Sequence, residues 1–274
     1  MNGRILALLG ALMLSAAALG DATPALAARC GGDFNSFVAG MSAEAQAAGV
    51  SSSVTSAAFG GMSQDMAVLN FDRRQRYTFN KSFEQYVSTR VGSGRINGGR
   101  AMLQRNAALL SRIEQRFGVP RQILVAIWGL ETDFGKGDMG KLPVFRVLAT
   151  MAHDCRRTEL FQGELLAALK IVQRGDLPLR DLIGAYAGEI GQTQFLPSSY
   201  IKYGVDFDGD GRVDLRHSVA DVLASTANLL HTNGFKMGAP YGEGTANFEA
   251  MREWNHATIY RKTIAYFADQ LGGQ

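Results

Sequence analysis

The sequence is poor in the features that mark several large functional classes. Only 19% of its 274 residues are charged, the formal net charge is +3, and Lys and Arg do not gather in a block, so nothing indicates a nucleic-acid partner. The four histidines lack metal-ligand spacing, and P-loop, Gly-x-Ser-x-Gly and dinucleotide-binding fingerprints are absent. The sequence therefore gives no support to a nucleotide enzyme or a serine hydrolase.

Long apolar runs are also scarce, and the clearest one opens the chain. Arg4 precedes an apolar run from Ile5 to Leu19, and Ala25 and Ala27 then fit the A-x-A rule of signal-peptide cleavage. The run is shorter than the roughly 20 residues that cross a bilayer. We therefore predict a signal peptide over 1–27 and a mature protein over 28–274, periplasmic, monomeric and without a membrane anchor.

Cysteine is limited to Cys30 and Cys155. An even number of cysteines in an exported chain indicates a disulfide, because disulfides persist in oxidising compartments. Closing a loop of this length would stabilise the protein by roughly 4 to 5 kcal/mol in the chain-entropy treatment. The alternative is a pair of buried free thiols.

Apolar residues at helical spacing predict a mainly α-helical fold with few short strands. Phe34, Phe37, Val38 and Met41 follow this spacing, as do Phe79, Phe83, Tyr86 and Val87. We predict a break over 92–99, then one helix from about Met102 that ends at Gly118, with Pro120 in the first turn of the next helix. Later helices are predicted at about 157–173 and 219–233.

One carboxylate falls in an unexpected place on the helix predicted after Pro120. At 100° per residue from Ile123, Glu131 lies at about 80°, inside the apolar arc of Ile127 and Trp128. The predicted arc also includes Phe134. An ionised carboxylate there is costly unless it is protonated, paired or facing a cleft. Glu131 is therefore either a buried structural residue or a general acid whose pKa is raised by apolar neighbours.

A second segment, 185–200, combines small residues with amides and rings. Gln192 and Gln194 offer donor and acceptor groups, while Phe195 and Tyr200 offer flat apolar faces. This mixture suits carbohydrate binding. A Gly-rich turn that leads into a helix after Pro197 would have a similar composition.

Together these segments form a familiar set of motifs. Ile-Trp-Gly-Leu-Glu-Thr-Asp-Phe-Gly at 127–135, Cys-Arg-Arg at 155–157, Gly-Gln-Thr-Gln-Phe-Leu-Pro-Ser-Ser-Tyr at 191–200 and the Asp-rich run 205–214 occur in this order. The sequence thereby resembles the membrane-bound lytic transglycosylase B family, glycoside hydrolase family 103, over nearly all of the mature chain.

The resemblance implies a lysozyme-like helical catalytic core at about 100–274, preceded by a helical part at about 28–92. It implies cleavage of the MurNAc–GlcNAc β-1,4 bond of peptidoglycan glycan strands with formation of 1,6-anhydro-MurNAc ends, and no required cofactor. The family's essential glutamate falls on Glu131. Phe195 and the residues matched to the family's substrate contacts are the predicted binding residues: Tyr86, Arg156, Arg157, Gln194, Trp254, Asn255 and Tyr260.

Three positions depart from the family's pattern. Ala185 stands where many members have Ser, and Leu229 where a cleft Tyr is common, so sugar hydrogen bonds are expected to be lost at both. Glu189 replaces a small residue and adds a second acid near Gln194. We expect it at the rim of the site or behind it, with a catalytic assistant as the alternative.

The Asp-rich loop is similar to the calcium-binding loop of EF-hands. Its predicted ligands are Asp206, Asp208, Asp210, Arg212 through its carbonyl, and Asp214. Position 12, where the EF-hand has a bidentate Glu, is His217, which weakens the case for metal. The loop either binds Ca²⁺ weakly or is a metal-free turn held by Asx hydrogen bonds, with Ser218 and Asp221 as a capping box for the next helix.

Two other functions remain open. A hydrolytic muramidase would need a second carboxylate about 5 to 9 Å from the first, and Asp133 and Glu189 are the candidates. A non-catalytic peptidoglycan-binding protein would use the same cleft without turnover.

Overall fold

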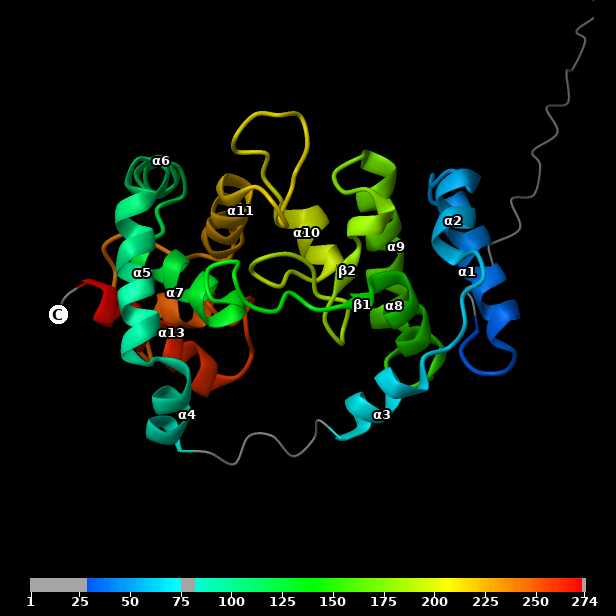
Figure 1. Cartoon of the computed structure of the whole chain (residues 1–274), viewed down its shortest axis with the longest axis horizontal. Helices are drawn as coiled ribbons and strands as arrows, with labels where there is room; N and C mark the ends of the chain where they lie inside the picture. The colour runs from blue at the N-terminus through cyan, green and yellow to red at the C-terminus, as the bar shows by residue number, and fades with distance from the viewer. Residues whose placement is uncertain (1–28, 75–81, 273–274) are drawn as a thin grey trace, which may run out of the picture.

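A computed structural model describes residues 29–74 and 82–272. The predicted signal peptide lies outside these residues. In the described ranges, no helix combines the length and the apolar character needed to span a bilayer. The predicted mainly helical fold is confirmed (Figure 1), with these helices: α1 (Phe34–Ala47), α2 (Ser52–Phe59), α3 (Met66–Arg74), α4 (Phe83–Arg90), α5 (Ser93–Arg105), α6 (Ala107–Phe117), α7 (Arg121–Thr132), α8 (Val144–His153), α9 (Thr158–Arg174), α10 (Pro197–Tyr203), α11 (Val219–Thr232), α12 (Ala246–Ala250) and α13 (Thr258–Gly272).

The strands of the described residues are short. β1 (Leu142–Pro143) pairs antiparallel with β2 (Ile183–Gly184), with Leu142 opposite Gly184. A 3-10 turn, η2 (Leu179–Asp181), precedes β2. This small ribbon joins the turn after α7 to the segment before α10.

Local sequence signals set several helix ends, among them the predicted end at Gly118. α6 stops at Gly118 and α9 stops at Gly175, both in the left-handed conformation that glycine adopts without strain. The Ser218 hydroxyl accepts the amide of Asp221 and caps α11, but the predicted capping box is incomplete, because the Asp221 carboxylate accepts the amides of Phe207 and Asp214 instead. Pro120 is the residue before α7 and not, as predicted, part of its first turn.

The predicted break over 92–99 is wrong, because α5 runs through most of it. Its glycines provide space for close packing. A Cβ added to Gly99 would lie 2.6 Å from Leu271, and one added to Gly98 would lie 3.0 Å from the ring of Phe134. The predicted single helix to Gly118 is in fact two, α5 and α6, which meet at Asn106.

The turn after α7 also corrects the prediction that Phe134 belongs to the apolar arc of this helix. α7 ends at Thr132, and Asp133, Phe134 and Gly135 all have positive φ. Phe134 therefore lies beyond the helix, but its ring folds back to pack edge-on against Trp128, with 5.8 Å between ring centroids. Gly129 makes room for this ring, since a Cβ there would lie 2.7 Å from it.

The helices form two groups, at the two ends of the view in Figure 1, with α10 and the β1–β2 ribbon between them. One group holds α4, α5, α6, α7, α11 and α13, with α7 packed on α13 and α5. The other holds α1, α2, α3, α8 and α9, in which α8 lies against α9. α10 contacts both α9 and α11, and the β1–β2 ribbon lies near it.

The predicted Cys30–Cys155 disulfide is present. It links the segment before α1 to the turn between α8 and α9. The amide of Gly31 also donates to the carbonyl of His153, at 2.9 Å. The start of the described chain is thereby held on the second helix group.

Candidate active site

Glu131 lies in the last turn of α7 and reaches a pocket of about 280 Å³. The residues that precede Glu131 in α7 are buried, whereas the Glu131 side chain is partly exposed to solvent. Its Oε1 accepts two hydrogen bonds, from the Tyr260 hydroxyl at 2.6 Å and from Trp254 Nε1 at 3.2 Å. Oε2 receives no hydrogen bond from the residues that the structure describes. One carboxyl oxygen is thus fixed by the protein and the other is left to a ligand.

Burial raises the pKa of Glu131 to about 7. The hydrogen bonds from Tyr260 and Trp254 act in the opposite direction, because they stabilise the carboxylate. The negative charge of Glu189 raises the pKa further, and the positive charge of Arg90 lowers it. Glu131 therefore exchanges its proton near neutral pH, as a general acid or base must.

The residues that act on Glu131 come from distant parts of the chain. Trp254 follows α12, and Tyr260 is in the first turn of α13, which packs along α7. Tyr260 is buried, and both burial and the adjacent Glu131 raise its pKa well above the usual value. Its hydroxyl therefore stays a hydrogen-bond donor.

The pocket gathers several of the predicted binding residues. Gln194, Phe195, Trp254 and Asn255 line it together with Glu131. Phe195 packs edge-on against Trp254, with 5.3 Å between ring centroids, and so holds the indole that bonds to Glu131. Ala185, Glu189, Leu196, Ser199, Leu229 and Glu253 complete the lining.

The two departures at Ala185 and Leu229 thus face the pocket, and neither side chain can form a hydrogen bond there. Ser199 and Glu253 were missed by the sequence analysis. Ser199 lies in the motif at 191–200 and could have been found there. Glu253, next to Trp254, carried no signal of its own.

Gln192 and Gln194 have different roles, although the sequence treats them as a pair. Gln192 is buried: its Oε1 accepts Trp128 Nε1 at 2.9 Å, and its Nε2 donates to the carbonyl of Arg216 at 3.0 Å. The Thr132 hydroxyl also donates to the Gln192 carbonyl, at 2.5 Å. Gln192 therefore fastens the segment 190–195 to the last turn of α7, whereas Gln194 faces the pocket.

Backbone carbonyls hold the Gln194 side chain in place. It has a positive φ of 55°, and its Nε2 donates to the carbonyls of Gly191 at 2.8 Å and Met139 at 3.4 Å. Both bonds use the same nitrogen. The amide oxygen has no donor in the described part of the chain.

The structure does not bring Arg156 and Arg157 to the Glu131 pocket. Both guanidinium groups pair with Asp72 of α3, Arg156 at 2.9 Å, and Arg157 also covers the ring of Phe161. Together with Cys30 and Cys155 they line a separate pocket. Tyr86 is not in the Glu131 lining either. It lies on α4 beneath Arg90 and acts electrostatically on Tyr260.

The two candidate second acids occupy different positions. Asp133 caps α7, pairs with Arg95 at 3.1 Å and is not among the residues that line the pocket. Glu189 lines the pocket, and its Oε2 accepts the amide of Ala187 at 3.0 Å. Of the two, Glu189 is the one placed to face a ligand of Glu131.

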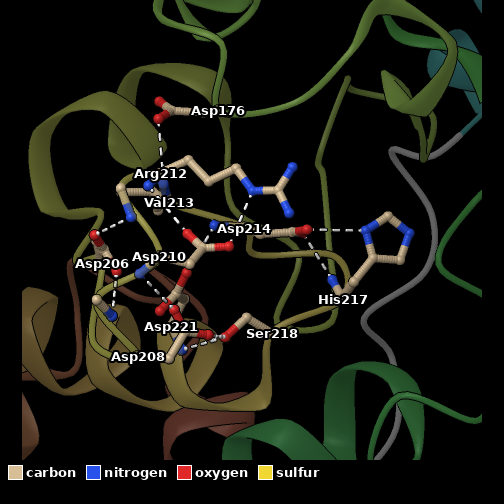
Figure 2. A network of polar contacts seen from close by, with 12 residues as sticks. Asp176, Asp206, Asp208, Asp210, Arg212, Val213, Asp214, His217, Ser218 and Asp221 are labelled. Atoms are coloured by element: carbon tan, nitrogen blue, oxygen red, sulfur yellow. Dashed lines mark hydrogen bonds and ion pairs between the residues drawn. The ribbon is translucent and has the colours of Figure 1, made fainter.

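The Asp-rich loop is held by hydrogen bonds within the protein (Figure 2). Asp206 accepts the amides of Gly209 and Gly211, and Asp210 accepts the amide and the Nε of Arg212. Oxygen atoms of Asp206, Asp208 and Asp210 lie within 4.8 Å of one another, as a shared cation would require. Three of the predicted ligands are thus together.

The remaining predicted ligands, Asp214 and Arg212, and the neighbouring Asp221 bond to other groups of the protein. Asp214 accepts the amide of His217 at 2.8 Å and lies 3.0 Å from its Nδ1. Asp221 is buried and accepts the amides of Phe207 and Asp214, and its burial raises its pKa. The Arg212 side chain brings a positive charge to Asp210. The loop thus places three carboxylates close together, and their oxygens already accept hydrogen bonds from the protein.

Comparison with known proteins identifies the family. The profile described as "Transglycosylase SLT domain" matches residues 33–246. The chain belongs to this family. The predicted resemblance is confirmed, and the match runs from the residue before α1 to the start of α12, so that α13 lies beyond it.

Individual relatives agree with this assignment. The SLT-domain chain is 43% identical over 131 residues to membrane-bound lytic murein transglycosylase B of Escherichia coli strain K12; the match covers 47% of this chain and 36% of that protein. The aligned region therefore spans about a third of the length of that relative.

Solved structures extend the likeness to the whole fold. The crystal structure of SltB3 from Pseudomonas aeruginosa, in complex with NAG-anhNAM-pentapeptide, has a TM-score of 0.83 and 31% identity, covering 89% of this chain and 80% of that one. The lytic transglycosylase Slt35 of Escherichia coli, in complex with calcium, has a TM-score of 0.77 and 24% identity, covering 89% and 96%. The lysozyme-like fold predicted for the SLT-domain chain is confirmed.

Proposed function

We propose that this protein is a peptidoglycan lytic transglycosylase that cleaves the MurNAc–GlcNAc β-1,4 bond and leaves 1,6-anhydro-MurNAc ends, with Glu131 as its acid/base. Family membership and the two transglycosylase relatives that are more than 30% identical support the activity. The observation that carries the proposal is the Glu131 carboxyl, which has both protein donors on one oxygen and a pKa of about 7.

The first half of the reaction uses Glu131 as an acid. Because Tyr260 and Trp254 both donate to Oε1, the proton of the neutral carboxyl belongs on Oε2. Oε2 gives this proton to the oxygen of the glycosidic bond as that oxygen leaves C1 of the muramic sugar. The same two donors then stabilise the carboxylate that remains.

The second half uses the carboxylate as a base. The muramic C6 hydroxyl attacks C1, a new C6–O–C1 bond closes the anhydro ring, and Glu131 takes the hydroxyl proton. The nucleophile belongs to the substrate, so neither water nor a second protein carboxylate is required. This proposed chemistry also requires no cofactor.

We further propose that Gln194, Phe195 and Asn255 contact the glycan, because they line the same pocket as Glu131. For Trp254 and Tyr260 we propose that they also hold Glu131, as the two hydrogen bonds indicate. Arg156 and Arg157 are proposed as contacts for a more distant part of the substrate. Tyr86 is proposed as a contact at the α4 side of the cleft.

A hydrolytic muramidase is the second candidate, and one observation favours it. Glu189 lines the pocket and its charge acts on Glu131, as a carboxylate that activates water would. A non-catalytic glycan-binding protein is less well supported, since the partly buried Glu131 carboxyl has a pKa suited to proton transfer.

The site of action follows from the proposed substrate. We propose export to the periplasm, which the Cys30–Cys155 disulfide supports because such bonds persist in oxidising compartments. For the loop 206–217 we propose at most weak Ca²⁺ binding, because its carboxylates already have donors from the protein.

The test is digestion of purified peptidoglycan by wild type and Glu131→Gln, with mass spectrometry of the products. Gln keeps the size and polarity but cannot exchange the proton, so activity should fall by roughly 10²–10⁴-fold or more, while circular dichroism should show an intact fold. Anhydro ends are one water lighter than reducing ends. Reducing ends as the main product would replace the transglycosylase with a muramidase, and near-normal activity of Glu131→Gln would remove Glu131 from the chemistry.

A further inference from the structure

A cavity of about 330 Å³ lies beside α2 and α8, in the helix group that does not hold Glu131. Three segments of the chain line it: the end of α2 with the loop after it, the start of α8 with Pro143 before it, and η2 with β2. It shares no lining residue with the Glu131 pocket. The chemistry proposed for Glu131 therefore gives this cavity, here called the Arg180 pocket, no role.

Much of the lining of the Arg180 pocket is apolar. Phe145 and Leu182 are buried core residues that also line it, and Met62 and Ile183 are partly buried. Leu179 is 37% exposed, which makes it one of the few large apolar side chains open to solvent in the described residues. An apolar side chain that entered the cavity would remove this surface from water.

Two guanidinium groups add positive charge to this lining. The Arg180 side chain is 83% exposed, and its ion pair with Asp181 is long, at 4.0 Å. The Nε of Arg146 lies 3.4 Å from Asp65 and forms no hydrogen bond within the described residues. Neither aspartate lines the cavity, and its lining contains no other carboxylate. The cavity therefore complements a ligand that joins an apolar group to a negative charge.

The β1–β2 ribbon beside the cavity limits how a ligand can bind. Pro143 has no amide hydrogen, and the carbonyl of its partner Ile183 accepts Arg216 Nη1 at 2.8 Å. A ligand strand therefore cannot extend the ribbon in the regular ladder pattern at these two residues. Recognition is left to side chains that enter the cavity.

We propose that the Arg180 pocket docks a partner protein through an acidic peptide segment. One apolar side chain of the segment fills the cavity, and a neighbouring Asp or Glu of the segment pairs with Arg180 and Arg146, as carboxylates do with guanidinium groups. A lipid surface fits less well, because attraction to anionic lipid takes a cluster of about four to eight Lys and Arg, and this lining has two. The inference does not depend on the proposed function.

The experiment selects random heptapeptides displayed on phage against the wild type, with Arg180→Glu as the counter-selection. Enriched peptides should combine an apolar residue with Asp or Glu. For the best synthetic peptide, titration calorimetry should show a roughly tenfold weaker Kd with Arg180→Glu, because a charge-assisted bond is lost. Leu179→Asp should weaken it similarly, since it places a carboxylate in the apolar lining. Arg105→Glu makes the same charge change at an exposed position on α5 outside the cavity, and should retain the wild-type Kd within about twofold.

Other outcomes would overturn the docking site. These are a selection that enriches no acidic peptide over the counter-selection, and a peptide Kd that is the same in Arg180→Glu and the wild type. Co-sedimentation with phosphatidylglycerol vesicles that Arg180→Glu abolishes would assign the cavity to a lipid surface instead.

Peptidoglycan digestion separates this inference from the proposed function. Arg180→Glu and Arg105→Glu should digest peptidoglycan at the wild-type rate and melt at the wild-type temperature, because both side chains are exposed and lie outside the Glu131 pocket. Loss of digestion in Arg180→Glu alone, with an unchanged melting temperature, would place the cavity in the substrate cleft and overturn the docking role. If the wild type digests no peptidoglycan, the proposed function fails, while the peptide Kd still tests the docking site.

Discussion

At the scale of single residues, the environment of Glu131 shows how one carboxyl is given two chemically different oxygens. Oε1 is held by Tyr260 and Trp254, and Oε2 has no donor among the described residues. Burial raises the pKa while the two donors lower it, and burial is the larger effect. The balance places the pKa where both the acid and the base form are accessible.

This balance predicts the pH dependence of the reaction. The first step needs the protonated carboxyl, so kcat/KM should fall as the pH rises through about 7, the pKa of Glu131. Trp254→Phe keeps a ring against Phe195 but removes a donor that lowers this pKa. The falling limb should therefore move to higher pH, and Tyr260→Phe should move it further, since Tyr260 is the stronger of the two donors.

The measurement is a pH profile of kcat/KM on one soluble glycan substrate. Tyr241→Phe is the control: it also removes a tyrosine hydroxyl bonded to a carboxylate, that of Asp269, but outside the pocket. The falling limb of the pH profile of Tyr241→Phe should stay at the same pH as in the wild type. A limb that moves to lower pH in Trp254→Phe would show that the indole does not stabilise the ionised carboxylate.

The sequence could predict the exceptional position of Glu131 but not its partners. Helical spacing alone places a carboxylate in an apolar arc. The donors are 123 and 129 residues further along the chain. The packing of α13 on α7 brings Tyr260 to Glu131, and Trp254, on the segment before α13, packs against Phe195. Resemblance to a family pointed to Trp254 and Tyr260 as sugar contacts, and their hydrogen bonds to Glu131 appear only in three dimensions.

At the scale of elements, glycine was the hardest residue to interpret. In 92–99 it suggested a break, whereas Gly98 and Gly99 allow α5 to lie close to Phe134 and Leu271. A glycine can be needed for a turn or for a close contact between elements, and the sequence alone does not distinguish these two roles. At Gly118 the interpretation as a helix end was correct, because an amphipathic stretch stopped there as well.

The loop 206–217 gives a prediction about metal. Its carboxylates already accept backbone amides, and Arg212 pairs with Asp210. We therefore expect a Ca²⁺ dissociation constant no tighter than about 10⁻⁴ M, seen as a small rise in melting temperature at millimolar Ca²⁺. Arg212→Gln removes the competing positive charge and should bind Ca²⁺ more tightly.

Titration calorimetry and thermal melts with Ca²⁺ and Mg²⁺ provide the check. The double variant Asp206→Asn/Asp208→Asn should lose the response to Ca²⁺. Nanomolar affinity in the wild type would contradict this prediction. It would show that His217 in place of Glu at position 12 lowers the Ca²⁺ affinity much less than the EF-hand comparison implies.

At the scale of the whole molecule, the disulfide has the largest predicted effect on stability. It joins residues 125 positions apart and fastens the start of the described chain to the second helix group. Cys30→Ser/Cys155→Ser should lower the free energy of unfolding by roughly 4 kcal/mol, because the unfolded chain regains the entropy of an open loop. Neither cysteine lines the Glu131 pocket, so turnover well below the melting temperature should persist.

Denaturant unfolding with and without a reducing agent measures this effect. Reductant should destabilise the wild type and leave the double variant unchanged. Equal unfolding midpoints for the oxidised wild type and the double variant would mean that the link contributes no net stability. Activity lost at low temperature would instead connect the disulfide to the neighbouring Arg156 and Arg157.

The order in which the site is assembled along the chain has a consequence for biosynthesis. A ribosome completes α7, and with it Glu131, well before it reaches Trp254 and Tyr260. A nascent or prematurely terminated chain that stops before residue 254 carries the carboxyl but neither of its donors, nor the helix that buries it. On the proposed function, the site is thus complete only after nearly all of the chain has been made, and we expect products truncated before residue 254 to be inactive.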